Sequence, residues 1–242
     1  SDRAVKIIRV VFYVDDGIFL APHAGEIDKA INDLKNAGFD IEDKGTLKDY
    51  LGVNVEYLSN GRIKLSQPHL IDQIIQETGL TSHSRTQSTP AQSTRILHRD
   101  QHGEPFDDSF HYRSVIGKLN FLEKTTRPDI AYATHQCARF CEDPKQSHAK
   151  AVIHLAQYLK GTRDKGIILD PNRLKSLECY ADADCSGNWN RTTAADDPST
   201  AKSRTGFVIM LADCPLFWSS KLQAQIALST TEAEYIALSQ AL

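Results

Sequence analysis

Two kinds of hydrophobic spacing alternate along this chain of 242 residues. Between residues 5 and 21, β-branched and aromatic residues flank a short polar interruption, which predicts strand, turn and strand. The stretch 24–38 instead repeats its apolar positions every three or four residues, which predicts an amphipathic helix. Residues 50–66 alternate apolar and polar positions on both sides of Asn60-Gly61, the strongest short hairpin signal. The first ~66 residues therefore combine strands with one helix.

The middle of the chain is mostly helical in pattern. We expect a helix over 66–79, with Ser66 as its cap, an early proline and Gly79 at its end. The Ser/Thr/Gln-rich residues 81–94 predict an exposed linker. Helical spacing then returns in three further segments, which we expect to pack together as helices: 107–125, 127–143 and 147–161.

Strand patterns resume at Ser176. The candidate strands are 176–184, 205–212 and 215–221. We expect residues 225–242 to run from a strand into a helix, in which Thr231 and Glu234 have the spacing of a capping box. The sequence of elements therefore predicts an α+β fold.

The bulk numbers restrict the class of protein. A formal net charge of −3 and a pI of about 6.3 count mildly against a nucleic-acid binder, whose surface is usually basic. No apolar stretch approaches the ~20 residues that span a membrane, so we expect no membrane association. The chain opens on "SDRAVKII", without a methionine or a signal-peptide pattern, and we expect it to be an excised piece of a longer protein.

The chain has five cysteines and no secretory signal, and an odd number of cysteines in that setting indicates reduced thiols. Cys137 and Cys141 lie one helical turn apart, with His135 nearby. A zinc site would need a fourth ligand and usually has tighter spacing. We therefore favour thiols packed in a core over a zinc site.

The run "VVFYVDDGIFLA" sets Asp15 and Asp16 side by side among apolar residues. Asp16-Gly17 between two apolar runs favours a hairpin turn, because both residues tolerate positive φ. A hairpin apex can also project two carboxylates into a cleft. Adjacent carboxylates repel unless one is protonated or they share a cation, and paired Mg²⁺ ions serve nucleotidyl transfer. The turn and the metal site are compatible.

A second acidic motif is "YADADCSGN". Asp182 and Asp184 resemble the start of a calcium-binding EF-hand loop, but Thr193 stands where that loop requires Glu, so we reject the EF-hand. Asp182 would instead meet Glu234 if the last helix packs behind this strand. The alternative is that Glu232 and Glu234 only stabilise the helix N-terminus through its dipole, and both interpretations stay open.

The segment "TTRPDI" places Arg127 before a proline at the start of a helix. Arg127 could contact a phosphate backbone. A solvated or salt-bridged arginine is the more common outcome.

Read together, these motifs resemble the Pol polyprotein of copia-type retrotransposons. "YVDD" is similar to the catalytic hairpin of reverse transcriptases, and "YLGVNVEY" to the strand pair that grips the primer. "YRSVIGKLNFLEKTTRPDIAYA" and "HLAQYLKGT" resemble the helical segment between polymerase and ribonuclease H. "YADADCSG", "SRTGFVIML" and "FWSSKLQAQIALSTTEAEYIALS" resemble the start of the ribonuclease H domain. The resemblance covers nearly the whole chain, in order.

The resemblance implies three parts: the C-terminal part of a reverse-transcriptase palm, a helical thumb or connection, and the N-terminal part of a ribonuclease H-like α/β domain. They would cover residues 1–66, 67–170 with a linker at 81–107, and 171–242. The parent would be an RNA-directed DNA polymerase with ribonuclease H activity.

The resemblance also implies roles for individual residues. Asp15 and Asp16 would hold Mg²⁺ at the polymerase centre, and Asp182 and Glu234 would be the first two carboxylates of a ribonuclease H metal site. Nucleic-acid contacts would come from Tyr13 near the primer terminus, from Tyr50 and Gly52 in the primer grip, and from Arg127.

The implied partners are an RNA template, a DNA primer, an RNA–DNA hybrid and the remainder of the Pol polyprotein. The implied location is cytoplasmic, in virus-like particles, with a nuclear phase left open. The family's two centres each use further aspartates, which we expect outside residues 1–242, so we expect both Mg²⁺ sites to be incomplete and the isolated chain inactive. Cys185, where the family usually has tryptophan, is a departure that fits a divergent copy.

Two other classes of function stay open. The chain could be a non-catalytic remnant of a retrotransposon that binds nucleic acid or a protein through its helices. A weaker alternative is a metal-binding regulatory protein built on "DADCSG".

Overall fold

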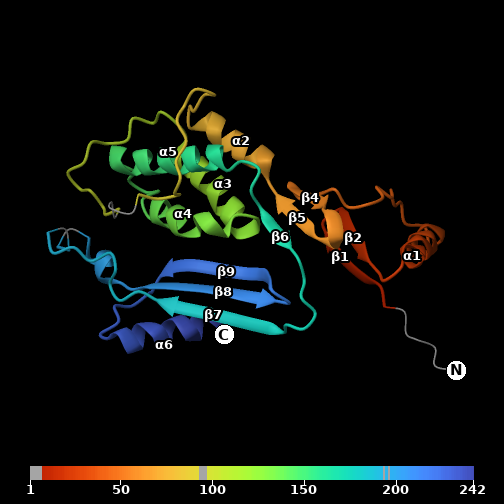
Figure 1. Ribbon diagram of the computed structural model, residues 1–242. Coiled ribbons are helices and arrows are strands. Elements are labelled where there is room, and N and C mark those ends of the chain that lie inside the picture. The colour runs from red at the N-terminus through yellow and green to blue at the C-terminus, as the bar shows by residue number, and fades with distance from the viewer. Residues whose placement is uncertain (1–6, 93–96, 193, 196) are drawn as a thin grey trace. The chain divides into compact units, whose positions relative to one another are not determined.

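The computed structural model describes residues 7–92, 97–192, 194–195 and 197–242, and it is a mixed α+β structure (Figure 1). The chain divides into two compact units, residues 1–48 and 49–242. The three-part division at residues 66 and 170 stays a prediction. None of the described helices is long and apolar enough to cross a membrane.

The first unit contains one hairpin and one helix. Strands β1 (Arg9–Tyr13) and β2 (Asp16–Leu20) pair antiparallel, as the alternation around the two aspartates predicts. The helix α1 (Ala24–Asn36) follows, and its only buried side chain among the described residues is Ile31. The predicted first strand began at residue 5; residues 5 and 6 lie outside the described part of the chain.

The second unit begins with a small antiparallel sheet. Its strand order is β3 (Asp49–Tyr50), β4 (Val53–Tyr57), β5 (Ile63–Ser66) and β6 (Ile167–Leu169). A short 3-10 turn η1 (Ser59–Gly61) joins β4 to β5 at the predicted Asn60-Gly61 hairpin. The sequence pattern does not predict β6, which returns from the helical region to pair with β5. Three residues are too few to show a period.

The helical region packs four helices around one core. They are α2 (Pro68–Glu77), α3 (Tyr112–Thr125), α4 (Ala131–Ala138), which follows the 3-10 turn η2 (Pro128–Ile130), and α5 (Gln146–Gly161). The prediction of three packed helices after the linker is confirmed. The expected Ser66 cap is wrong: Ser66 ends β5, and the helix begins at Pro68 after Gln67, which makes no side-chain cap bond.

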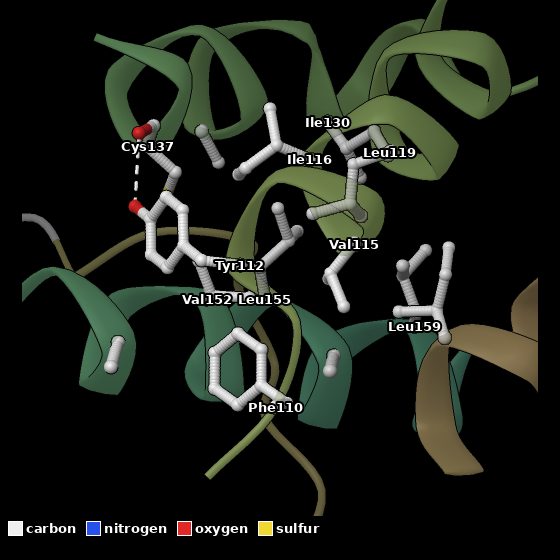
Figure 2. Close-up of a cluster of buried hydrophobic side chains, with 14 of the residues drawn as sticks. Phe110, Tyr112, Val115, Ile116, Leu119, Ile130, Cys137, Val152, Leu155 and Leu159 are labelled. Atoms are coloured by element: carbon white, nitrogen blue, oxygen red, sulfur yellow. Dashed lines mark hydrogen bonds between the residues drawn. The ribbon is translucent and has the colours of Figure 1, made fainter. Parts of the chain in front are cut away.

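The core lies where α3, α4 and α5 face each other, and Figure 2 shows its side chains. Leu119, Val152 and Leu155 are fully buried, each contributing about 1.5–3 kcal/mol relative to an exposed side chain. The Tyr112 hydroxyl donates to the Cys137 carbonyl at 2.9 Å. Cys137 is buried in this core, which confirms a packed core thiol, and burial raises the pKa of the thiol to about 12.

The segment between α2 and α3 lies against α5 where it is described. The Lys160 ammonium donates to the carbonyls of Thr81 and Ser82 at 2.8 and 2.7 Å. The Gln87 amide donates to Gln157 Oε1 at 2.9 Å, and His154 Nε2 bonds to the Thr89 carbonyl at 3.0 Å. Residues 93–96 of the predicted linker lie outside the described residues.

The last part of the second unit is a three-stranded antiparallel sheet with one helix. Its order is β7 (Leu177–Ala183), β8 (Arg204–Leu211) and β9 (Cys214–Leu222), and α6 (Thr230–Ala241) packs on β7 and β8 (Figure 1). The 3-10 turn η3 (Pro198–Ala201) precedes β8. Ala233, Ala237 and Ala241 are buried at four-residue spacing, so the helix presents a face of small side chains to the sheet.

Two local predictions in this part were wrong. Residues 223–229 form no strand before α6. The helix is capped by Ser229, whose hydroxyl accepts the Glu232 amide at 3.1 Å, while Glu232 Oε2 accepts the Leu228 amide at 2.7 Å. The observed pair Ser229 and Glu232 has the same three-residue spacing as the expected pair Thr231 and Glu234. Both observed residues lie two positions earlier because the helix begins two residues earlier than expected.

Candidate functional site

The apex of the first hairpin is a two-residue turn at Val14-Asp15. Tyr13 pairs with Asp16, and Val14 has φ of 53°. The expected positive φ at Asp-Gly was therefore placed wrongly, because Asp16 and Gly17 already belong to β2. A tight hairpin needs positive φ at the first turn position to match the strand twist, and here that position is a β-branched residue.

Gly17 has a packing role in this hairpin. It lies directly across from Phe12, and a Cβ placed on Gly17 would come within 2.9 Å of Phe12 Cε1. The Phe12 ring also meets the Phe19 ring edge-to-face at 6.2 Å between centroids. An aromatic side chain thus covers the glycine and fixes the register of the two strands.

The two aspartates are exposed at the end of this hairpin. Asp15 lies in the turn and Asp16 starts β2. Tyr13 is 58% and Val14 83% exposed, so the apex presents four consecutive accessible side chains. Carboxylate oxygens are the ligands that Mg²⁺ takes from proteins. The donor chemistry of the apex fits this ion.

The segment that resembles the primer grip contains the turn between β3 and β4. Tyr50 pairs with Val53, and the turn residues Leu51 and Gly52 have φ of 51° and 76°. Two positive φ values are characteristic of a type I′ turn. A Cβ added to Gly52 would meet no described atom within 4 Å, so the demand for glycine there comes from the backbone alone.

Arg127 is held in an internal network. It is 1% exposed, and its Nε and Nη2 groups donate to the two carboxylate oxygens of Asp129 at 2.9 and 2.8 Å. It also donates to the carbonyl and hydroxyl oxygens of Thr162 at 3.0 and 2.8 Å. The Tyr158 hydroxyl donates to Asp129 at 2.7 Å. Of the two alternatives for Arg127, this is the salt-bridged one. Four hydrogen bonds within the protein use the guanidinium N–H groups that would otherwise donate to a phosphate.

The network also sets the ionisation of Asp129. Burial acts to raise the pKa of Asp129, but the hydrogen bonds from Arg127 and Tyr158 and the charge of Arg127 outweigh it, and the pKa is lowered. The Asp129 carboxylate is therefore the stable partner of the buried guanidinium at neutral pH.

The second pair of carboxylates comes from β7 and α6. The helix packs on that strand, as the interpretation of Asp182 and Glu234 required. Both side chains are exposed. The register places Asp182 on the same sheet face as Gly206 and Ser220. Their meeting in one metal site stays a prediction.

Asp184 has a structural role. Its Oδ1 atom accepts the Arg204 backbone N–H at 2.6 Å, and its own N–H donates to the Arg204 carbonyl at 3.1 Å. This pair of bonds continues the β7–β8 ladder one step past the end of β7. Thr193, the position that excluded an EF-hand, lies outside the described residues.

Within the described part of the chain, no group of three or more His, Cys, Asp or Glu side chains is placed to hold a metal ion. The hairpin apex supplies two carboxylates of the right chemistry. The roles of Asp15, Asp16, Asp182 and Glu234 as metal ligands stay predictions.

One buried polar cluster is not predicted by the sequence pattern. Arg204, 6% exposed, and Asn188, 4% exposed, lie between α4 and the sheet. Asn188 ends the motif "YADADCSGN" and Arg204 lies in "SRTGFVIML", but neither motif indicates that these two polar side chains are buried.

Comparison with known proteins defines the class. Residues 2–93 match the family described as reverse transcriptase (RNA-dependent DNA polymerase). This stretch includes strands β1 to β5 and the Asp15-Asp16 apex. No solved structure matches the chain.

Several curated relatives match almost the whole chain. It is 29% identical to a retrovirus-related Pol polyprotein from transposon RE1 of Arabidopsis thaliana, over 96% of this chain and 15% of the relative. It is 31% identical to the corresponding polyprotein from transposon TNT 1-94 of Nicotiana tabacum, over 97% of this chain and 17% of the relative. A putative transposon Ty5-1 protein of Saccharomyces cerevisiae is 31% identical over 96% of this chain and 72% of the relative.

The chain belongs to the copia-type family of retrotransposon Pol polyproteins. It spans about 15% of the length of the first polyproteins it matches.

Proposed function

We propose that the chain is a segment of an RNA-directed DNA polymerase with ribonuclease H activity. Residues 1–66 would be the rear of the polymerase palm, 67–170 a helical thumb or connection with its linker at 81–107, and 171–242 the start of a ribonuclease H domain. One observation carries the proposal: a tight hairpin presents Asp15 and Asp16, adjacent and exposed, within the stretch that matches the reverse transcriptase family.

In this proposal Asp15 and Asp16 bind Mg²⁺ through their carboxylate oxygens. When bound, the ion supplies electrostatic stabilisation of the phosphate oxygens during nucleotidyl transfer. The hairpin fixes the spacing of the two carboxylates, because one lies in the turn and the other in the first pair of the ladder. Tyr13 would face the primer terminus, and the type I′ turn of Gly52, next to Tyr50, would contact the primer strand.

The second centre would be built on β7 and α6. Asp182 and Glu234 would supply carboxylates to a Mg²⁺ site for hydrolysis of RNA in an RNA–DNA hybrid. Packing of α6 on β7 supports this assignment, since it brings the two elements together. Glu232 accepts the Leu228 amide at the N-terminus of α6, so the capping bond of that turn goes to Glu232 and not to Glu234.

The partners follow from the proposed reaction. They are an RNA template, a DNA primer, an RNA–DNA hybrid and the rest of the polyprotein. We place the parent in cytoplasmic virus-like particles, with a nuclear phase open. Each centre receives two carboxylates from these residues, and the family's centres use more, so we expect the 242-residue chain alone to extend no primer.

Primer extension tests the proposal. A Pol polyprotein that carries this chain should extend a DNA primer on an RNA template with Mg²⁺. Asp15→Asn or Asp16→Asn should lower the rate by more than about 100-fold, since outer-shell partners of a metal already cost 10–100-fold. Asp28→Asn, at an exposed position of α1, is the matched control and should retain the rate. Full activity in Asp16→Asn would contradict the proposal.

The main alternative is the non-catalytic remnant. It predicts salt-dependent binding of an RNA–DNA hybrid, without extension or cleavage by any polyprotein that contains the chain. The same assay separates the two, because the remnant would bind the primed template and leave its length unchanged.

A further inference from the structure

Arg204 is a buried cation whose side chain has no carboxylate partner among the described residues. It is 6% exposed, and its bonds all go through Nη1: to His135 Nδ1 at 3.1 Å and to the carbonyl and hydroxyl oxygens of Ser220 at 3.3 and 3.4 Å. Its Nε and Nη2 groups are buried and have no hydrogen-bond partner in the described structure. A guanidinium has five N–H groups, so three of them lack an acceptor.

The surroundings of Arg204 offer only partial compensation. Its guanidinium carbon lies 4.8 Å from the centre of the Tyr132 ring, a cation–π contact. Asp184 lies nearby but accepts the backbone N–H of Arg204 rather than its side chain. Burial lowers the pKa of Arg204, and the charge of Arg139 acts in the same direction, while the charge of Asp184 opposes them only in part. A buried charge of this kind normally has a counter-charge.

A second unpartnered donor belongs to the same cluster. Asn188 is 4% exposed, and its Nδ2 group is buried without a partner in the described part of the chain. Its Oδ1 atom accepts from Gln136 Nε2 at 3.5 Å, and the same Nε2 donates to the Tyr132 hydroxyl at 3.1 Å. Gln136 therefore links Asn188 to the ring that covers Arg204.

The charges around the cluster favour an anion. Arg139 is paired with Asp197 at 3.3 Å, which removes that carboxylate as a partner for Arg204. His135 accepts a bond from Arg204 and is held neutral, because burial and then the charge of Arg204 lower its pKa to about 4. Lys221 adds further positive charge near His135.

We propose that the cluster of Arg204 and Asn188 between α4 and β8 is a binding site for a phosphate oxyanion. A phosphate group offers several acceptor oxygens and negative charge, and arginine donates to it in bidentate geometry. The unpartnered donors Nε and Nη2 of Arg204 lie on one edge of the guanidinium, which is the geometry of such a bidentate pair. Asn188 Nδ2 adds a neutral donor. The site uses none of the carboxylates assigned to the two metal centres.

Titration with inorganic phosphate tests this site on the 242-residue protein, in a phosphate-free buffer at constant ionic strength. Wild-type protein should bind one phosphate saturably by calorimetry and should show a higher Tm when it is bound. Arg204→Met should weaken binding by more than about tenfold, the loss expected for a charge-assisted hydrogen bond. Arg173→Met, at an exposed position, is the matched control and should bind as wild type does.

Asn188→Ala covers the case in which Arg204→Met does not fold. It removes an unpartnered donor and leaves the charge, so it should weaken phosphate binding while the protein stays folded. No saturable binding of phosphate to the wild type would overturn the proposal. Unchanged phosphate binding by both Asn188→Ala and a folded Arg204→Met would overturn it as well. Unchanged binding by Asn188→Ala alone would also overturn it if Arg204→Met does not fold.

The source of the phosphate is resolved by competition. If the site takes a phosphate of nucleic acid, an RNA–DNA hybrid should displace inorganic phosphate from the wild-type protein. If it takes free phosphate, the hybrid should leave the phosphate affinity unchanged. Both results support the site and differ only in the source, and neither depends on polymerase activity.

Discussion

Val14 and Gly52 show how the same backbone demand is met by different residues. Both lie in two-residue hairpin turns and have φ of 53° and 76°. Glycine adopts this conformation without a steric penalty, whereas for a β-branched residue it is strained. Backbone strain of this kind concentrates at functional sites, and here it lies beside the two aspartates of the apex.

Gly52→Ala should destabilise the second unit by about 1–2 kcal/mol, because a Cβ is disfavoured at this positive φ although space is available. Gly117→Ala is the matched control. Gly117 lies within α3, where an added Cβ would meet no described atom within 4 Å, and the substitution should stabilise the protein by about 0.5–1 kcal/mol. Urea unfolding of the three proteins measures both changes. A stabilising effect of Gly52→Ala would contradict the type I′ turn.

At the scale of residues, the sequence predicted the hairpin but not its register. Asp16-Gly17 has the composition of a turn, so the turn was expected there. The structure moves it to Val14-Asp15, because pairing Phe12 with Gly17 lets an aromatic ring cover the glycine. That packing preference involves both strands, and a local turn rule contains no information about it.

The helices, whose apolar positions repeat over several turns, were predicted well. The four helices of the second unit's core have three to four apolar positions repeated over several turns. The strand β6 has three residues, and its pairing with β5 joins segments about a hundred residues apart. The observed start of α6 differs from the expected one because Ser229 and Thr231 are both residues that can cap a helix.

Asp129 joins two elements, since it lies in η2 and binds Arg127 and the α5 residue Tyr158. Asp129→Asn should cost about 2 kcal/mol, less than the 3–5 typical of a fully buried pair because the Asp129 side chain is 38% exposed. A double-mutant cycle with Arg127→Met, measured by urea unfolding at pH 7, gives the coupling. The coupling should fall as pH drops through the lowered pKa of Asp129, because its stabilisation is present above the unfolded pKa.

Arg163 provides the control for this cycle. It pairs with Asp72 in the same bidentate geometry, but the two side chains are 39% and 46% exposed. Arg163→Met should change the free energy of unfolding by less than about 1 kcal/mol. Equal costs at the two pairs would show that burial does not strengthen the Arg127–Asp129 interaction.

At the scale of the whole molecule, the order of the motifs was enough to identify the family. The same order did not predict the complete set of metal ligands at either site. A single "YVDD" fits a bare hairpin, but the same motif followed by the primer-grip-like and ribonuclease H-like segments resembles one family. The ligand sets could not be predicted in the same way. Metal sites combine residues from distant segments, and the elements that carry Asp182 and Glu234 are brought together only by the packing of α6 on β7.

The central claim is that the Asp15-Asp16 apex binds the catalytic metal, and iron-directed cleavage tests it most directly. Fe²⁺ replaces Mg²⁺ in a Pol polyprotein that carries this chain, and ascorbate with peroxide then cuts the backbone near the bound ion. We expect cuts beside residues 15 and 16 that excess Mg²⁺ suppresses, and that Asp16→Asn abolishes while Asp28→Asn retains them. Cleavage at the apex that is unchanged in Asp16→Asn, or that is absent from the wild type, would contradict the account.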